Sequence, residues 1–76
     1  MIDITTKRKG AFWDTLIAIP AGERILYARG DMCDSVHRGD AMHASDRELV
    51  ALVQKKNGPF DYSYIAQKLK PKKGKR

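Results

Sequence analysis

Apolar residues recur at helical spacing in the segment from residue 11 to residue 19. An apolar stripe with this period predicts a short amphipathic helix. We expect Thr5 or Thr6 to cap its start, and Pro20 to end it, because proline disfavours helical backbone in the residue before it. The predicted stripe consists of Phe12, Trp13, Leu16, Ile17 and Ile19.

The pattern then changes to alternation. In residues 23–29, Ile25 and Tyr27 alternate with Arg24, Leu26 and Ala28, which predicts a strand with one face more buried than the other. Residues 31–47 are polar, and there we expect a short helix near 32–37, with Asp31 as its N-cap, and a helical turn near 41–47 after a break at Gly39.

Residues 45–69 allow two interpretations. Ser45-Asp46-Arg47-Glu48 fits a capping box, and the apolar run from Leu49 to Val53 with a stop at Gly58-Pro59 would make a helix. Asn57-Gly58 between two apolar runs, in contrast, is a strong signal for a β-hairpin.

We favour the hairpin over residues 49–69. Because Pro59 has no N–H to donate, we expect a four-residue loop at 56–59. This loop would pair Val53 with Tyr62. It would also pair Ala51 with Tyr64, and aromatic residues opposite small or β-branched ones are favourable cross-strand pairs. Three aromatic residues would then share the buried face of the sheet: Phe60, Tyr62 and Tyr64.

The resulting order of helix, strand, short helices and two strands is that of a winged helix. We therefore expect an α+β fold, a small winged-helix-like domain with an N-terminal helix and a three-stranded antiparallel sheet that ends in a C-terminal hairpin. The helical interpretation of residues 45–56 would give a small α+β domain without a wing. A chain of 76 residues has room for one domain, which we place at 1–69, followed by a flexible basic tail at 70–76.

The charge is concentrated in that tail. The net charge is +6, and residues 68–76 hold six positive charges and no negative one, so residues 1–67 carry nine basic and nine acidic groups. A cationic arm on a neutral domain favours nucleic acid or an acidic protein surface as partner. The candidate binding residues are the basic positions near the N-terminus, on the hairpin and in the tail: Lys7, Arg8, Lys9, Lys55, Lys56, Lys68, Lys70, Lys72, Lys73, Lys75 and Arg76.

We expect no catalytic, metal or cofactor site. Cys33, His37 and His43 would need a carboxylate as fourth ligand for zinc, and we interpret them as part of a polar loop. We expect Cys33 to be neither a ligand nor a nucleophile, so that Cys33→Ser leaves folding and partner binding unchanged. The sequence has no glycine-rich phosphate loop, and no apolar segment long enough for a signal peptide or a membrane span, so we expect a non-enzymatic protein in the cytoplasm.

Residues 31–48 would hold the recognition helix of a winged helix. They carry five acidic residues and two arginines, a net charge of about −3. Because an acidic recognition segment repels phosphates, this favours a protein partner over direct readout of duplex DNA.

Several segments resemble small phage and prophage proteins with a Phe-Trp helix, a strand ending in Tyr, and a final pair of strands. They are Ala11-Phe12-Trp13, residues 19–27 (Ile-Pro-Ala-Gly-Glu-Arg-Ile-Leu-Tyr), residues 49–56 (Leu-Val-Ala-Leu-Val-Gln-Lys-Lys) and residues 62–66 (Tyr-Ser-Tyr-Ile-Ala). The resemblance covers 11–30 and 48–67 and departs at 31–47.

This resemblance implies a phage-type regulator that docks on host RNA polymerase and alters initiation or termination, with the tail contacting nucleic acid or an acidic surface. One alternative is a winged-helix protein that binds duplex DNA directly. Another is a phage inhibitor of a different host protein.

Overall fold

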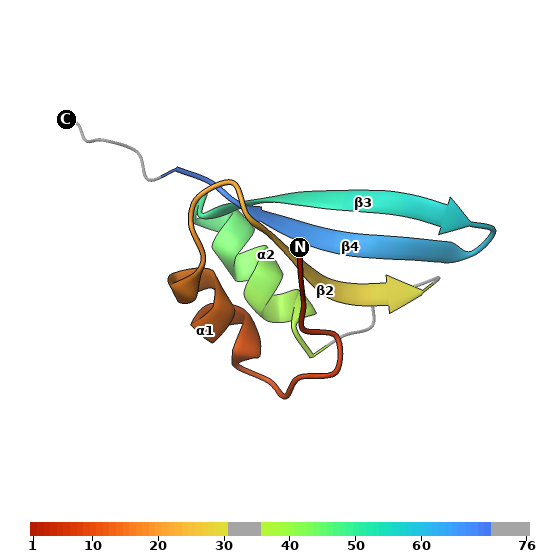
Figure 1. Ribbon diagram of the computed structural model, residues 1–76, viewed down its shortest axis with the longest axis horizontal. Helices are drawn as coiled ribbons and strands as arrows, with labels where there is room; N and C mark the ends of the chain where they lie inside the picture. Colours follow the sequence, from red (N-terminus) through yellow and green to blue (C-terminus); the bar gives the residue numbers. More distant parts are fainter. Residues whose placement is uncertain (31–35, 71–76) are drawn as a thin grey trace.

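The fold is α+β, as the sequence predicts. The computed structural model describes residues 1–30 and 36–70 (Figure 1). Its elements, in chain order, are β1 (Ile2–Asp3), α1 (Ala11–Ala18), β2 (Arg24–Gly30), α2 (Arg38–Asp46), β3 (Val50–Gly58) and β4 (Asp61–Lys68). The short helix expected near residues 32–37, with its Asp31 cap, falls largely outside the described residues. The helix expected near 41–47 is present as α2, but Gly39 lies within it, so the predicted break there is wrong.

The sheet has four strands in the order β1-β2-β4-β3. The antiparallel part, β2-β4-β3, matches the predicted three strands, whereas β1 pairs in parallel with β2 and was not expected. The Ile4 N–H extends this pairing by donating to the Leu26 carbonyl oxygen at 3.0 Å. A strand of two residues is too short to show any alternation, so its formation depends on the edge that β2 offers.

Helix α1 begins at Ala11, too far along the chain for Thr5 or Thr6 to cap it. Gly10 precedes it with φ 98°, a left-handed conformation that glycine adopts without steric cost. The Thr5 N–H and hydroxyl instead donate to the Asp3 carboxylate, at 2.9 and 2.7 Å, so the expectation that Thr5 or Thr6 caps the helix is wrong. The helix buries only a narrow stripe, and Ile17, predicted to belong to it, is 79% exposed.

Both helices cover the same face of the sheet (Figure 1). Phe12 lies at the centre of the core, where its ring meets those of Trp13 and Tyr27 edge-on at centroid distances of 5.7 and 6.3 Å. The other buried residues of this cluster come from both helices and from the strands: Ile4, Leu16, Ile19, Ile25, Ala28, Ala41, Ala44, Val50 and Ala66.

Strand β2 is more buried than its alternation predicts, because Leu26 and Ala28, expected on the exposed face, are also buried. A bulge lies between these two residues in the pairing with β4. The extra residue at a bulge changes the alternation of side chains, so Tyr27 and Ala28 both join the core cluster.

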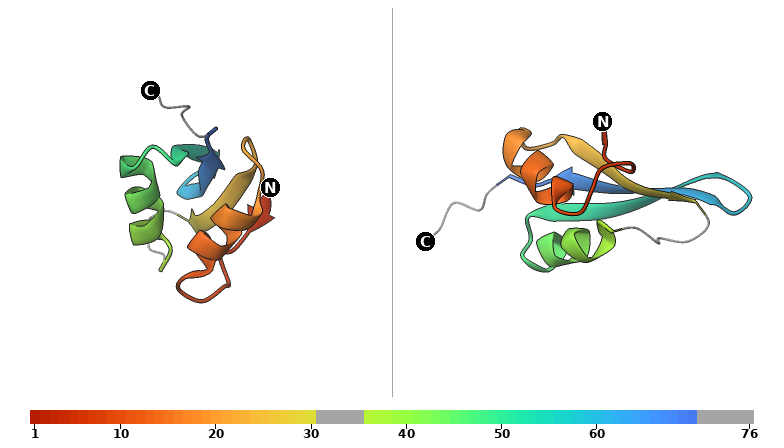
Figure 2. Two further views of the ribbon diagram at one scale, coloured as in Figure 1. Left: turned by 90° about the vertical axis from the view of Figure 1, so that its left-hand side faces the viewer. Right: turned by 90° about the horizontal axis from the view of Figure 1, so that it is seen from below.

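The predicted hairpin is confirmed, and Figure 2 shows it extending beyond the helices, but its register is wrong. Val53 pairs with Ile65 and Ala51 with Gln67, three positions further along β4 than predicted. The strands continue to the pair Gly58 and Asp61, so the turn consists of residues 59–60.

The turn explains this shift. Pro59 suits the first turn position, because proline fixes φ at about −65°. The following Phe60 has φ 58°, and a positive φ at the second position is the pattern of a type II turn. Asn57 sits at a bulge and donates from Nδ2 to the Ser63 hydroxyl at 2.7 Å. Phe60 is therefore 81% exposed at the hairpin tip and is not part of the core, contrary to expectation.

Candidate interaction surfaces

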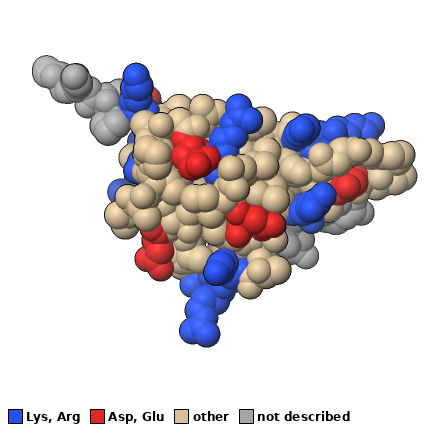
Figure 3. All heavy atoms as spheres, in the orientation of Figure 1, with Lys and Arg blue, Asp and Glu red and all other residues tan. Residues whose placement is uncertain are grey.

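The basic residues predicted to bind a partner lie in separate places. Lys7, Arg8 and Lys9 are exposed in the loop between β1 and α1, whereas Lys55 and Lys56 are exposed near the tip of the hairpin. Figure 3 shows these separate groups of basic side chains with acidic ones between them. Lys70 is exposed just after β4, and four further predicted residues lie outside the described part of the chain: Lys72, Lys73, Lys75 and Arg76.

Lys68 has a role within the protein. Its Nζ donates to the carbonyl oxygens of Leu16 and Ile19, at 2.8 and 2.7 Å. These oxygens lie at the C-terminal end of α1, where the helix dipole is negative and the helix has no basic residue of its own in its last turn. Lys68 therefore supplies the stabilising cation from a distant strand, and its ammonium is already engaged.

An apolar groove of about 440 Å³ lies beside this contact. Trp13, Leu16 and Ile17 of α1 form one wall, and Leu49 and Leu69 form the other. We call this site the α1 groove. The groove has no local signal in the sequence, because Trp13 and Ile17 fit a core stripe and the two leucines belong to separate strand-like runs.

Backbone hydrogen bonds fix the wall opposite α1. The Leu49 N–H donates to the Ala44 carbonyl oxygen at 2.9 Å at the end of α2. The Leu69 N–H donates to the Leu49 carbonyl oxygen at the same distance, which joins the two leucines across the base of the hairpin. Glu48, between α2 and β3, turns the chain with φ 61°.

Basic residues also line the rim of the α1 groove. Arg47 and Lys70 line it together with Lys68, and Glu48 is the acidic residue of the lining. Because the Lys68 ammonium is engaged with α1, the exposed charges of the rim are Arg47 and Lys70 against Glu48, and the rim is positive. Of these residues, Lys68 and Lys70 are predicted from the sequence to bind a partner, whereas Arg47 is not.

The face of the sheet away from the helices carries further basic residues. The register aligns Arg29 of β2, Ser63 of β4 and Lys55 of β3 across the sheet. The neighbouring row is apolar and contains Leu26, Ile65 and Val53. Leu26 and Ile65 are buried, so Val53 is the exposed apolar residue of this row, next to the positive charge of Lys55.

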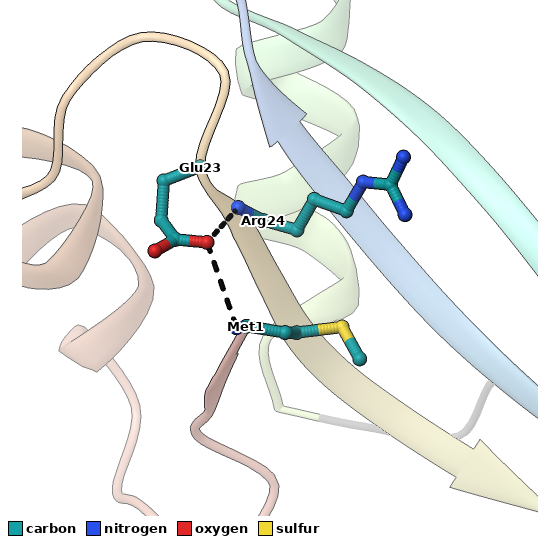
Figure 4. Close-up of polar contacts among 3 residues, drawn as sticks. All are labelled: Met1, Glu23 and Arg24. Atoms are coloured by element: carbon teal, nitrogen blue, oxygen red, sulfur yellow. Dashed lines mark hydrogen bonds and ion pairs between the residues drawn. The ribbon is translucent and has the colours of Figure 1, made fainter.

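The carboxylates of Asp3 and Glu23 accept hydrogen bonds from neighbouring residues. Hydrogen bonds from Thr5 are the main cause that lowers the pKa of Asp3, and the positive charge of Arg29 adds to the effect. The pKa of Glu23 is also lowered, first by the Arg24 N–H, which donates to its carboxylate at 2.8 Å, and then by the Met1 ammonium at 3.6 Å (Figure 4).

Helix α2 presents both signs of charge to solvent. Arg38, His43 and Asp46 are exposed, and Asp40 is half-buried in the first turn. Met42, also exposed, lines a smaller depression of about 280 Å³ between α2 and the hairpin together with Arg38 and other residues. A ligand that meets α2 thus meets a surface of mixed charge.

Within residues 1–30 and 36–70, His37 and His43 belong to no metal site. His37 is fully buried, and its Nε2 donates to the Ile4 carbonyl oxygen at 2.8 Å, which connects the start of α2 to the end of β1. Among the described residues, no three histidine, cysteine or carboxylate side chains are placed to share a metal ion. Cys33 lies outside the described residues, so the expectation for it stays a prediction.

Within residues 1–30 and 36–70, no helix is long and apolar enough to cross a membrane. Comparison of the chain with protein-family models, curated proteins and solved structures found no match.

Proposed function

We propose that this protein is a non-enzymatic, winged-helix-like transcription regulator of phage type that docks on host RNA polymerase. The single observation that carries the protein-docking part of this proposal is the α1 groove, an apolar cavity with a positive rim on the surface of a small domain. Clustered apolar side chains exposed in a concave site favour contact with another macromolecule. The choice of polymerase rests on the resemblance of residues 11–30 and 48–67 to small phage proteins.

The arrangement of elements supports a winged-helix relationship. Strands β2, β4 and β3 form an antiparallel sheet in that order, α1 precedes β2, and α2 precedes the hairpin. In this comparison α2 takes the place of the recognition helix and the β3–β4 hairpin that of the wing. The parallel strand β1 is an addition to that pattern.

The mixed charge of α2 favours a protein partner over duplex DNA. A helix that enters the major groove needs a surface that phosphates do not repel. Asp46 is exposed on α2, as Arg38 is, and the phosphate-binding candidates belong to separate segments: the loop between β1 and α1, the hairpin and the end of β4.

One observation supports direct DNA binding as the second candidate. Lys55 and Lys56 are exposed on the hairpin, and Arg38 lies at the start of α2, next to the depression between α2 and the hairpin. A wing and a recognition helix contact DNA from such positions, with the lysines bound to phosphates.

Two binding measurements distinguish docking on RNA polymerase from direct binding of duplex DNA. The first is biolayer interferometry with purified, nucleic-acid-free bacterial RNA polymerase, and the second is fluorescence anisotropy with a mixed-sequence DNA duplex across a salt series. We expect saturable binding to polymerase. We expect only weak binding to the duplex, and it should disappear at physiological salt.

The matched variants are Lys55→Glu/Lys56→Glu on the hairpin and Ile17→Glu in the α1 groove. Duplex binding that is tight, strongly salt-dependent and lost in the hairpin variant, together with no binding to polymerase, would establish the second candidate and refute the first. Binding to neither polymerase nor DNA would refute both.

A further inference from the structure

We infer that the α1 groove binds an acidic amphipathic helix of a partner protein, with the apolar side of that helix in the groove and its carboxylates on the rim. This inference rests on the proposed function, because it names the chemistry of the protein segment that the site accepts. Helix-in-groove recognition uses apolar side chains spaced at i, i+3 or i+4 and i+7.

Exposed apolar side chains on three separate segments converge on the groove. Ile17 of α1 is 79% exposed, Leu49 before β3 is 42% exposed, and Leu69 after β4 is 38% exposed. Each alone would be an ordinary surface residue, but together with Trp13 they line one cavity. Burying them under an apolar helix face would remove this area from water, which is the favourable term for binding.

The rim determines the charge of the occupant. Lys68 is bound to α1, so Arg47 and Lys70 are the exposed cations of the rim, and Glu48 is the single acidic residue of the lining. The sequence continues beyond Lys70 with four more basic residues and no acidic one. A segment with carboxylates beside its apolar stripe is complementary to this rim, whereas a basic segment is repelled.

Two other occupants are disfavoured by composition and charge. Residues 71–76 of the same chain contain no large apolar side chain to fill the groove. The tip of the hairpin of a second copy offers Phe60, which is exposed, but Lys55 and Lys56 stand near it and would meet the positive rim.

Trp13 makes occupancy directly measurable. It is the only tryptophan in the sequence and it lines the groove, so the fluorescence of the full-length chain reports on this site. The probe is a synthetic helical peptide without aromatic residues, with leucines at i, i+3, i+4 and i+7 and glutamates at the flanking positions. Two control peptides are a scrambled version, and a version with lysine in place of each glutamate.

We expect the acidic peptide to shift the Trp13 emission to shorter wavelength and to saturate. The dissociation constants of both control peptides should be weaker by about tenfold or more, which corresponds to about 1.4 kcal/mol. Equal binding of the three peptides, or no change in emission with any of them, would overturn the inference.

Two glutamate substitutions locate the site. Ile17→Glu places a charge in the groove and should weaken binding of the acidic peptide by about tenfold or more. Phe60→Glu is the matched control, because Phe60 is 81% exposed and belongs to the turn of the hairpin, which extends away from the helices (Figure 2), and it should leave the affinity unchanged. Both side chains are exposed, so neither substitution disturbs the core. Peptide binding that survives Ile17→Glu would contradict the assignment to the groove.

The inference and the proposed function fail in different ways. If Ile17→Glu binds RNA polymerase as well as the unmodified chain does, the groove is not the docking site and the inference is wrong, while the measured polymerase binding itself supports the proposed function. If the acidic peptide binds at Trp13 but polymerase does not bind, the groove assignment stands and the polymerase proposal is wrong.

Discussion

Lys68 stabilises a helix that lies some fifty positions earlier in the sequence. Its ammonium donates to two carbonyl oxygens at the end of α1, those of Leu16 and Ile19. Lys68→Met keeps most of the side chain but leaves these oxygens without their charged donor. We expect it to lower the free energy of unfolding by about 1–2 kcal/mol, measured by urea denaturation.

Lys70→Met is the matched control for this prediction. Lys70 is exposed and follows Lys68 by two positions, so its loss should change the free energy of unfolding by less than about 0.5 kcal/mol. Equal effects of the two substitutions would mean that the contact of Lys68 with α1 contributes nothing to stability.

The carboxylates of Asp3 and Glu23 make stability depend on pH. The pKa of each is lowered in the folded protein, Asp3 by hydrogen bonds from Thr5 and Glu23 by the Arg24 N–H. A lowered pKa contributes stability above the ordinary pKa of the group, and this contribution is lost as the pH falls through the lowered value. We therefore expect the protein to lose stability as the pH is lowered below about 4.

The variant Asp3→Asn/Glu23→Gln tests this dependence. It should lose less stability than the unmodified chain between neutral and acidic pH, as measured by the urea midpoint at each pH. Because both carboxylates are at the surface, the difference should be small and should diminish at high salt. Identical pH profiles would show that these hydrogen bonds do not contribute to folding.

At the scale of elements, the turn of the hairpin contains an unfavourable backbone conformation. Phe60 has φ 58°, which is uncommon for a bulky residue, and its side chain is mostly exposed. Phe60→Gly should raise the free energy of unfolding by about 0.5–1 kcal/mol, because glycine accepts this conformation without steric cost.

Phe60→Ala is the control, since alanine keeps the strain of positive φ. It should give no comparable gain in a thermal or urea denaturation series. An equal gain in both variants would assign the effect to the lost aromatic ring rather than to the backbone.

The hairpin also shows what local sequence can and cannot predict. Asn57-Gly58 between apolar runs correctly indicates two antiparallel strands, because the signal depends only on neighbouring residues. The register depends on whether Pro59 ends the loop or begins the turn, and the structure has it in the turn. A shift of three positions exchanges the faces of the strands, so Val53 pairs with Ile65 and lies on the face away from the helices.

At the scale of the whole molecule, the α1 groove could not be predicted, because its residues come from three distant segments. Trp13, Leu49 and Leu69 meet only after the hairpin base is joined by hydrogen bonds to α2 and across β3 and β4. The basic residues were predicted as a set, because charge is visible in the sequence. Their dispersal, and the internal contact of Lys68, follow from tertiary structure alone.

The basic residues after Lys70 should act on the rate of association. Deleting residues 71–76 removes four positive charges and leaves the α1 groove intact. We expect the association rate constant with RNA polymerase to fall at low salt and to approach that of the full chain at high salt, because screening removes long-range attraction. Stopped-flow or interferometry measurements across a salt series would test this, and equal rates at every salt concentration would contradict it.

The central position of β4 has a consequence for how the chain folds. β4 lies between β2 and β3 although it follows both in the sequence, and Arg24 pairs with Gln67, 43 positions later (67 − 24). Such non-local pairing slows folding. A chain interrupted after Gly58 lacks β4, which joins β2 to β3 and contributes Ala66 to the core. A premature stop codon before β4 would therefore yield an unfolded polypeptide for cellular proteases, and no smaller version of the domain would accumulate.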